Sequence, residues 1–200
     1  MYTIFYIYNY CYYGLYIMDK NLQSKNFCLK IVLYGPECTG KTTLARLLAN
    51  HYKTQWVPEF AREYLQNKWD KSKKVCTKED LPVIVSGQLK LEINQIPKAR
   101  KYLFCDTNIL VTRIWSETHF DGYCDPEIIK LSEELKYDYY FLTSIDIPWK
   151  KDDLRDRPND REKMFLYFKE TLDKKNKPYS IIKGSVENRL SNCINIINNL

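Results

Sequence analysis

Short apolar runs alternate along the chain with longer amphipathic stretches. In the longer stretches apolar residues recur every three or four positions, which is the helical period, whereas the short runs are typical of buried strands. The apolar runs predict strands at residues 28–34, 56–57, 102–105, 138–143 and 179–182. The amphipathic stretches predict helices at residues 42–52, 60–67, 77–96, 109–117, 159–174 and 186–197, and one that begins at Asp125–Pro126.

This alternation predicts an α/β fold, in which right-handed crossovers build a mainly parallel sheet with helices on both faces. Ligands of such sheets bind beyond the carboxyl ends of the strands. Three groups follow the ends of predicted strands, namely the loop after Tyr34, Glu59 and Asp106. These groups are therefore the first candidates for a functional site.

The loop after the first predicted strand carries a complete phosphate-binding pattern, Gly35-x-x-x-x-Gly40-Lys41-Thr42, and it opens a predicted helix. Backbone N–H groups of such a loop hold phosphate oxygens together with the positive end of the following helix. We expect Lys41 to reach the β- and γ-phosphates of ATP and the Thr42 hydroxyl to hold Mg²⁺. The residues expected to bind ATP are Gly35, Pro36, Glu37, Cys38, Thr39, Gly40, Lys41, Thr42 and Thr43.

Asp106 ends the predicted strand Tyr102–Asp106, which reads YLFCD. A carboxylate at this point can hold Mg²⁺, directly or through water, as the second acidic piece of a nucleotide site. The alternative role is an N-cap for the helix that follows. We therefore predict that Thr42 and Asp106 form the metal site.

Glu59 follows the short second strand, so we expect it to face the acceptor side of the phosphate loop. A carboxylate near an attacking hydroxyl can orient it and accept its proton. Asp106 is the other candidate for this role, and both stay open at this point. Arg62, one turn further along, would pair with Glu59 or hold a phosphate. The alternative is that Glu59 belongs to the acidic first turn of a surface helix.

The segment LRDRPNDRE contains Arg155, Arg157 and Arg161. Guanidinium groups stabilise the charge that builds on a transferring phosphoryl group. Aspartates alternate with these arginines, so a solvated, salt-bridged loop is the alternative. Because the segment follows a strand end and contains Pro158, we expect a mobile lid. The residues expected to take part in catalysis are Lys41, Glu59, Asp106, Arg155 and Arg157.

Aromatic and amide side chains are candidates for holding a flat base. Trp56, Tyr64 and Trp149 offer stacking surfaces, and Gln88 offers a paired amide hydrogen bond. Taken singly, each is more commonly a core or surface residue than a ligand contact. The substrate pocket is expected to contain Trp56, Glu59, Arg62, Tyr64 and Gln88.

Composition limits the class of protein, its partners and its compartment. The chain has 200 residues, of which 44% are hydrophobic and 28% charged, as in one globular domain. Its formal net charge of +6 favours anionic partners, but the basic residues are scattered, so nucleotide phosphates suffice and nucleic-acid binding is not expected. The seven cysteines include no C-x-x-C pair, which argues against a zinc site or a disulfide framework and indicates a reducing cytoplasm.

The apolar start of the chain, up to Met18, lacks the basic beginning and small-residue cleavage site of a signal peptide. It is also too short and too rich in tyrosine for a membrane helix. We expect residues 1–27 to be an extension, untranslated upstream of Met18 or disordered, and residues 28–200 to form the domain. An interfacial anchor is the alternative.

Five segments, taken in order, resemble the ribosylnicotinamide kinase domain of NadR-type NAD-salvage proteins. They are YGPECTGKTTLARLLA, WVPEFAREYL, FCDTNILVTRIWSE, YDYYFLTSIDIPWKKDDLRDRPNDRE and PYSIIKG. The resemblance covers residues 30–200 and implies a P-loop NTPase of the nucleoside and nucleotide kinase type, an AAA-type ATP-binding domain. It further implies that ATP with Mg²⁺ phosphorylates the 5′-hydroxyl of ribosylnicotinamide. By the same resemblance, the PEFAREY segment and Gln88 line the nucleoside pocket, and Arg155 and Arg157 belong to the lid.

NadR-type proteins carry an adenylyltransferase domain with an H-x-G-H element before the kinase, and this sequence contains no such element. The resemblance therefore implies a stand-alone cytoplasmic kinase that acts on a small-molecule nucleoside. Two alternatives stay open. One is another nucleoside or nucleotide kinase of the same fold, and the other is a regulatory ATP-binding switch without a small-molecule acceptor.

Overall fold

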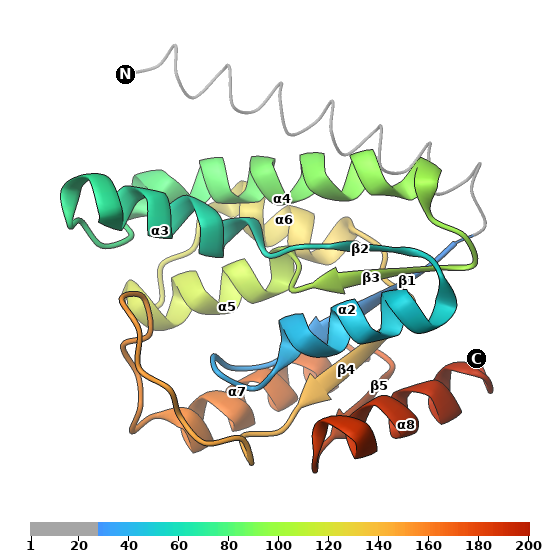
Figure 1. The fold of residues 1–200 in the computed structure, drawn as a ribbon. Coiled ribbons are helices and arrows are strands. Elements are labelled where there is room, and N and C mark those ends of the chain that lie inside the picture. Colours follow the sequence, from blue (N-terminus) through green and yellow to red (C-terminus); the bar gives the residue numbers. More distant parts are fainter. Residues whose placement is uncertain (1–27) are drawn as a thin grey trace.

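A five-stranded parallel sheet forms the centre of the protein (Figure 1). The computed structural model describes residues 28–200, so the predictions made for residues 1–27 lie outside the described residues. The strands follow the order β2-β3-β1-β4-β5 across the sheet. They are β1 (Leu29–Tyr34), β2 (Gln55–Val57), β3 (Tyr102–Asp106), β4 (Tyr139–Thr143) and β5 (Tyr179–Ile182). The predicted parallel sheet is confirmed, and each strand lies within one residue of its expected bounds.

Helices connect the strands, as the alternating pattern predicts. They are α2 (Lys41–Tyr52), α3 (Phe60–Ser72), α4 (Leu81–Gln95), α5 (Ile109–His119), α6 (Pro126–Glu134), α7 (Arg161–Lys174) and α8 (Val186–Ile197), with short 3₁₀ turns η1 (Lys78–Asp80) and η2 (Ile96–Lys98). The helix start expected at Thr77 is a capping box, in which Thr77 and Asp80 bond each other's backbone. Pro82 is tolerated because it falls in the first turn of α4.

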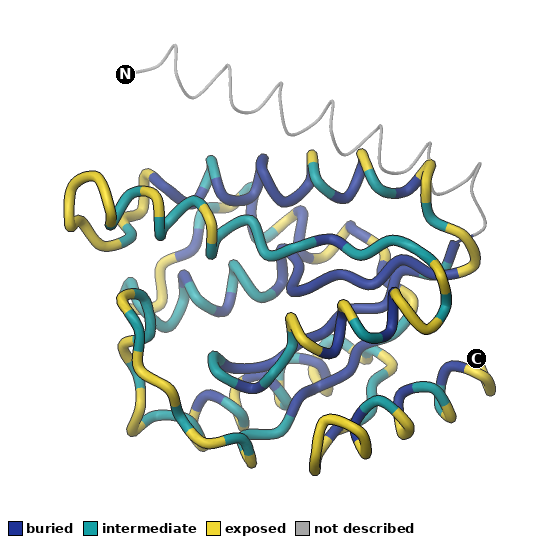
Figure 2. The backbone as a smooth tube through the Cα atoms, viewed as in Figure 1, coloured by how far each residue is buried: buried dark blue, intermediate teal, exposed yellow. Residues whose placement is uncertain are grey.

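Helices cover both faces of the sheet, because neighbouring strand residues point to opposite sides. On β1, Val32 and Tyr34 pack in one core with α4, α5, α6 and α7. Ile31 and Leu33 pack in the other core with α2 and α8. Figure 2 shows the strands as the most deeply buried part of the chain, lying between these two helical layers.

Helix α3 lies outside these layers and has no buried residue. It packs on α4, where a Cβ added to Gly87 would come within 2.4 Å of several atoms of the Phe60 ring. Glycine at this position therefore allows the start of α3 to approach α4 closely. This contact places Glu59 and Gln88 on neighbouring elements beside the carboxyl edge of the sheet.

The cysteines of the described residues are free thiols, and most of them are buried, in agreement with a role as small core residues. Of the described helices, none combines the length and the apolar character needed to cross a bilayer.

Candidate active site

The phosphate loop, residues 35–40, joins β1 to α2 at the carboxyl edge of the sheet. Cys38 and Gly40 both have positive φ angles, of 54° and 81°. Left-handed residues of this kind turn successive backbone N–H groups toward one concave side, where they bind anions. Gly40 precedes α2 as its N-cap and no side chain caps that helix, so its first N–H groups remain available to a phosphate.

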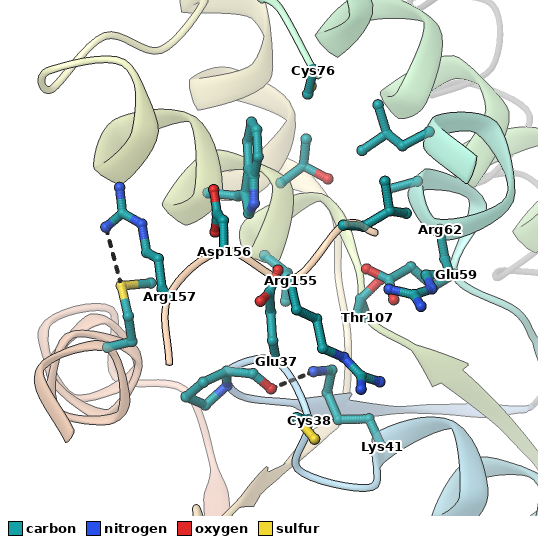
Figure 3. A pocket seen from close by; sticks show the side chains of 18 of the residues that line it. Glu37, Cys38, Lys41, Glu59, Arg62, Cys76, Thr107, Arg155, Asp156 and Arg157 are labelled. Carbon is teal, nitrogen blue, oxygen red and sulfur yellow. Dashed lines mark hydrogen bonds between the residues drawn. The ribbon is translucent and has the colours of Figure 1, made fainter. Parts of the chain in front are cut away.

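Lys41, the first residue of α2, folds back across its own loop (Figure 3). Its Nζ donates hydrogen bonds to the carbonyl oxygens of Pro36 at 2.6 Å and Gly35 at 3.0 Å. The ammonium therefore spans the mouth of the loop, where the terminal phosphates of a bound nucleotide would lie.

Asp106 lies beside the phosphate loop because β3 pairs with β1, which sets Asp106 opposite Leu33. One of its carboxylate oxygens, Oδ2, accepts a hydrogen bond from Thr42 Oγ1 at 2.5 Å. The other, Oδ1, is buried without a partner, and the residue is only 1% exposed. Burial and the nearby charge of Glu59 raise the pKa of Asp106 to about 7.

An unpartnered carboxylate oxygen beside a hydroxyl oxygen fits Mg²⁺, which prefers oxygen ligands in octahedral geometry. Within residues 28–200, no group of three or more His, Cys, Asp and Glu side chains is arranged to hold a metal. Thr42 and Asp106 would therefore supply the protein's share of the ligands, and nucleotide phosphates and water the rest.

A cavity of about 600 Å³ opens at the phosphate loop and continues between α3, α4, α5 and the segment 149–157 (Figure 3). Its volume falls within the range of small-molecule sites. The part far from the loop, called the aromatic end below, is lined by Trp69, Leu81, Ile84, Val111, Trp115 and Phe120. One cavity thus combines a phosphate-binding end with an apolar end.

Glu59 lines the cavity from the N-cap position of α3. Arg62 lines it from the first turn of the same helix. Of its two expected roles, the structure does not show the ion pair with Glu59, and the phosphate contact stays a prediction. Its guanidinium forms a two-pronged ion pair with Asp152 of the 149–157 segment, with one contact of 3.3 Å from Nη1 to Oδ1. Arg62 therefore links α3 to the predicted lid.

Gln88 lines the cavity from α4 and is 2% exposed. Its Oε1 accepts a hydrogen bond from the backbone N–H of Phe60 at 2.9 Å, which fixes the orientation of the amide. Its Nε2 is buried without a partner. Gln88 thus offers a fixed hydrogen-bond donor to whatever occupies the cavity, while its oxygen is already engaged by the protein. The paired amide hydrogen bond to a base stays a prediction.

The structure does not bring Trp56 and Tyr64 to the cavity, which corrects two of the substrate residues predicted above. Trp56 packs against the core of α2 and α8, because its neighbour Val57 takes the opposite face of β2. Tyr64 is engaged elsewhere, because its hydroxyl donates to Asp80 of η1 at 2.9 Å and its ring stacks on Phe60 of the same helix.

Trp115 and His119 line the cavity in place of Trp56 and Tyr64. Their rings lie one helical turn apart on α5 and stack with centroids 3.9 Å apart. Burial lowers the pKa of His119, so its ring favours the neutral form. The sequence carried one signal for this pair, an aromatic i, i+4 spacing on the helix that follows Asp106.

Two arginines of the predicted lid behave differently (Figure 3). Arg155 lines the cavity and its guanidinium extends toward Lys41, while Nη1 donates to the carbonyl oxygen of Lys150 at 2.6 Å. Arg157 also lines the cavity, but its guanidinium extends away from the loop and donates to the carbonyl oxygen of Thr118 at 2.6 Å. Arg155 is therefore placed toward the phosphate end, whereas Arg157 anchors the segment to α5.

Arg161 ties the same segment to the phosphate loop. It donates to the carbonyl oxygens of Ile147 at 2.8 Å and of Cys38 at 3.3 Å, and its guanidinium lies over the ring of Trp149. Trp149, considered above as a stacking surface, lines the cavity beside it. The segment is thus both a salt-bridged loop and a wall of the cavity.

The fold and the site define a P-loop nucleotide-binding protein with the architecture of the nucleoside and nucleotide kinases. The profile of the AAA domain family matches residues 30–189, and the chain belongs to this family. The chain is also 24% identical over 174 residues to the trifunctional NAD biosynthesis/regulator proteins NadR of Salmonella typhimurium and Escherichia coli. The match covers 86% of this chain and 42% of each relative, so the chain spans less than half of their length. The predicted NadR resemblance is confirmed.

Solved structures agree on the fold. A NadR protein in complex with NAD and AMP-PNP superposes with a TM-score of 0.67 at 19% identity, over 86% of this chain and 49% of that one. Deoxyadenosine kinase from M. mycoides superposes with a TM-score of 0.63 at 16% identity, over 86% of this chain and the whole of the kinase chain. These similarities confirm the P-loop kinase fold predicted from the sequence.

Proposed function

We propose that the chain is an ATP-dependent kinase that phosphorylates the 5′-hydroxyl of ribosylnicotinamide. The observation that carries this proposal is the cavity itself, which runs without interruption from Lys41 to the aromatic end. A nucleotide-binding switch needs the first of these ends only. A kinase for a small nucleoside needs both, with the reacting hydroxyl between them.

ATP would lie with its phosphates in the loop and against the start of α2. Lys41 would leave the carbonyl oxygens of Gly35 and Pro36 and neutralise phosphate charge. Mg²⁺ held by Thr42 and Asp106 would supply further positive charge at the β- and γ-phosphates. Arg155 would add charge from the lid side as negative charge builds on the transferred group. In this class of reaction, positioning and charge stabilisation supply most of the catalysis.

Glu59 is the better candidate for orienting the acceptor hydroxyl. Asp106 already accepts a hydrogen bond from Thr42 and would hold the metal, whereas Glu59 lines the acceptor side of the cavity. In the transfer, the acceptor oxygen bonds to the γ-phosphorus as the bond to the β–γ bridging oxygen breaks. ADP leaves, and the hydroxyl proton passes to the Glu59 carboxylate.

Features of the far end favour ribosylnicotinamide among nucleosides. The Trp115 ring offers a π face, which attracts a cationic ring such as a pyridinium. The free Gln88 Nε2 suits a carboxamide oxygen. The similarity to NadR proteins, which are named for NAD biosynthesis and of which one is solved in complex with NR, supports the same substrate.

A second candidate is another nucleoside or nucleotide kinase of the same fold. Chains named deoxyadenosine kinase and thymidylate kinase are covered by the match over 100% and 98% of their lengths, whereas the NadR chains are covered over about half. A match over nearly the full length of these kinase chains favours such a kinase over a switch without an acceptor.

The test is ADP release by the purified chain against a panel of nucleosides, followed by chromatography of the products. We expect phosphorylation of ribosylnicotinamide, and no NAD when nicotinamide mononucleotide and ATP are supplied. Lys41→Ala, with an unchanged melting temperature, is the inactive control. Consumption of thymidine or deoxycytidine alone would favour the second candidate, and nucleoside-independent ADP release would favour a switch.

A further inference from the structure

Glu37 is an acidic residue inside a loop that is built to bind phosphate. It follows Pro36, whose carbonyl oxygen accepts from Lys41, and precedes the left-handed residue Cys38. A carboxylate directed at the same phosphates would repel them. The Glu37 side chain must therefore point away from the phosphates that the backbone N–H groups of the loop bind.

The side chain of Glu37 extends from the loop into the cavity, toward the lid residues Arg155 and Asp156 (Figure 3). Its Oε2 is buried and has no hydrogen-bond partner. Burial, with Asp156 as the next cause, raises the pKa of this carboxyl to about 7, while Lys41 opposes the rise. A buried acceptor without a donor destabilises the free protein, so its presence at a cavity wall is better explained by a ligand that supplies the donor.

Other groups at this site also have a buried polar atom without a partner: Asp106 Oδ1, Gln88 Nε2 and Arg161 Nε. The first two divide the cavity between two ligands. Asp106 Oδ1 lies at the metal end, and Gln88 Nε2 lies toward α3 and α4; both residues are more than nine-tenths buried. Gln88 offers a donor and Glu37 an acceptor. The acceptor molecule must therefore carry a hydrogen-bond acceptor on its base and a hydrogen-bond donor near the phosphate loop.

The geometry of phosphoryl transfer locates that donor. The reacting hydroxyl must reach the γ-phosphate held near Lys41, so the sugar that bears it lies at the mouth of the loop. The base then occupies the aromatic end, further from the loop. The neutral donors nearest the loop are the remaining hydroxyls of the sugar, and Glu37 is the loop residue whose side chain enters this space.

We propose that Glu37 belongs to the acceptor site, where its carboxylate accepts a hydrogen bond from a secondary hydroxyl of the acceptor's ribose. The phosphate loop would then bind the sugar of the nucleoside acceptor as well as the phosphates of ATP. This role selects acceptors that carry the contacted hydroxyl over deoxy analogues that lack it. It rests on the proposed function, because it requires a nucleoside acceptor in the cavity.

A competing role for Glu37 is an ion pair with Arg155 when the lid closes on ATP. In the present arrangement Arg155 is engaged by Asp152 and by the carbonyl oxygen of Lys150. If Glu37 served the lid, its loss would lower turnover with every acceptor alike. If it binds the sugar, the loss depends on which hydroxyls the acceptor carries.

The experiment compares Glu37→Ala and Glu37→Gln with the wild-type chain, using ribosylnicotinamide and its 2′-deoxy and 3′-deoxy analogues. Glu63→Gln, a change at an exposed position on α3, is the matched control. We expect Glu37→Ala, which removes the acceptor, to raise the KM for ribosylnicotinamide by about 10- to 100-fold, the effect of losing a hydrogen bond to a charged group. Glu37→Gln keeps a neutral acceptor oxygen and should raise it less. The KM for ATP should change less than about twofold, because the loop backbone holds the phosphates. With the analogue that lacks the contacted hydroxyl, each Glu37 variant and the wild type should differ little.

Equal losses with all three acceptors, or a rise in the KM for ATP alone, would overturn the assignment of Glu37 while leaving the kinase intact. A wild-type chain that phosphorylates no nucleoside would overturn both proposals. Thermal melting of each variant identifies a loss that arises from misfolding.

Discussion

The hydroxyl of Thr42 donates a hydrogen bond to Asp106 at 2.5 Å across a sequence separation of 64 residues. Two neighbouring strands produce this contact, because β1 leads into the phosphate loop and β3 ends in Asp106 at the same edge of the sheet. The second oxygen of the carboxylate stays unpartnered and buried. We therefore expect the pair to hold a cation together.

Asp106→Asn should raise the Mg²⁺ concentration for half-maximal activity by at least about tenfold and lower kcat by about 10²-fold, the loss typical of one electrostatic group. The amide keeps an oxygen for Thr42 but loses the negative charge that attracts the metal. Titration of activity with Mg²⁺, beside calorimetry of ATP binding with and without Mg²⁺, measures the effect. Asp121→Asn, at an exposed turn, is the control. An unchanged Mg²⁺ requirement would exclude Asp106 from the metal site.

Arg155→Ala should lower kcat more than Arg157→Ala does. Arg155 extends toward Lys41, whereas Arg157 donates to the backbone of Thr118 at the far side of the segment. An interaction made mainly in the transition state lowers kcat and kcat/KM together. We expect a fall of about 10²-fold for Arg155→Ala with little change in nucleoside affinity. Steady-state kinetics of both variants checks this, and wild-type turnover in both would leave only a salt-bridged surface loop.

The sequence predicted the elements well because their signals are local. Apolar runs, the Thr77 capping box and Pro126 each act within a few residues of the feature they specify. The phosphate loop was predictable for the same reason, since its motif is contiguous. In contrast, the ion pair of Arg62 with Asp152 spans a separation of 90 residues and depends on how the segment 149–157 returns to α3.

Local sequence signals could not predict which residues line the aromatic end of the cavity. A strand as short as β2 contains too little alternation to indicate which side faces a cavity, so Trp56 was assigned to the pocket although Val57 faces α4. Trp115 lies on a helix whose inward face emerges only when α4 and α5 pack together. Which aromatic residue contacts a ligand is therefore decided by tertiary packing.

Trp115→Ala should change the acceptor KM, whereas Trp56→Ala should change the melting temperature. Trp115 lines the cavity, so its loss should raise the acceptor KM by about tenfold or more, in line with stacking worth about 1–3 kcal/mol per base. Trp56 packs against the core of α2 and α8, so its loss should lower the melting temperature and leave the acceptor KM nearly unchanged. Kinetics and thermal melting of both variants decide the matter. A raised acceptor KM in Trp56→Ala alone would restore the assignment made from the sequence.

Glu37→Gln should stabilise the ligand-free protein at pH 8 more than at pH 5. Burial raises the pKa of Glu37 to about 7 from 4.5, so the folded state holds this proton at pH values where the unfolded state has released it. Stability contributed by the neutral carboxyl is complete below pH 4.5, falls as the pH rises toward 7, and is absent above that. Glutamine is neutral throughout and escapes this loss.

Because Glu37 is only partly buried, the gain at pH 8 should be on the order of 1 kcal/mol, which corresponds to about 2–4 °C in melting temperature at this chain length. Melting curves of the wild type and Glu37→Gln at both pH values measure it, and the difference between the two proteins cancels the titration of every other group. Glu63→Gln, at an exposed position on α3, is the control for the loss of one negative charge. A gain of equal size at both pH values would mean that folding does not raise the pKa of Glu37. A loss at pH 8 would mean that the Glu37 carboxylate has a stabilising partner in the free protein. Either result would contradict the inference that a ligand supplies the missing donor.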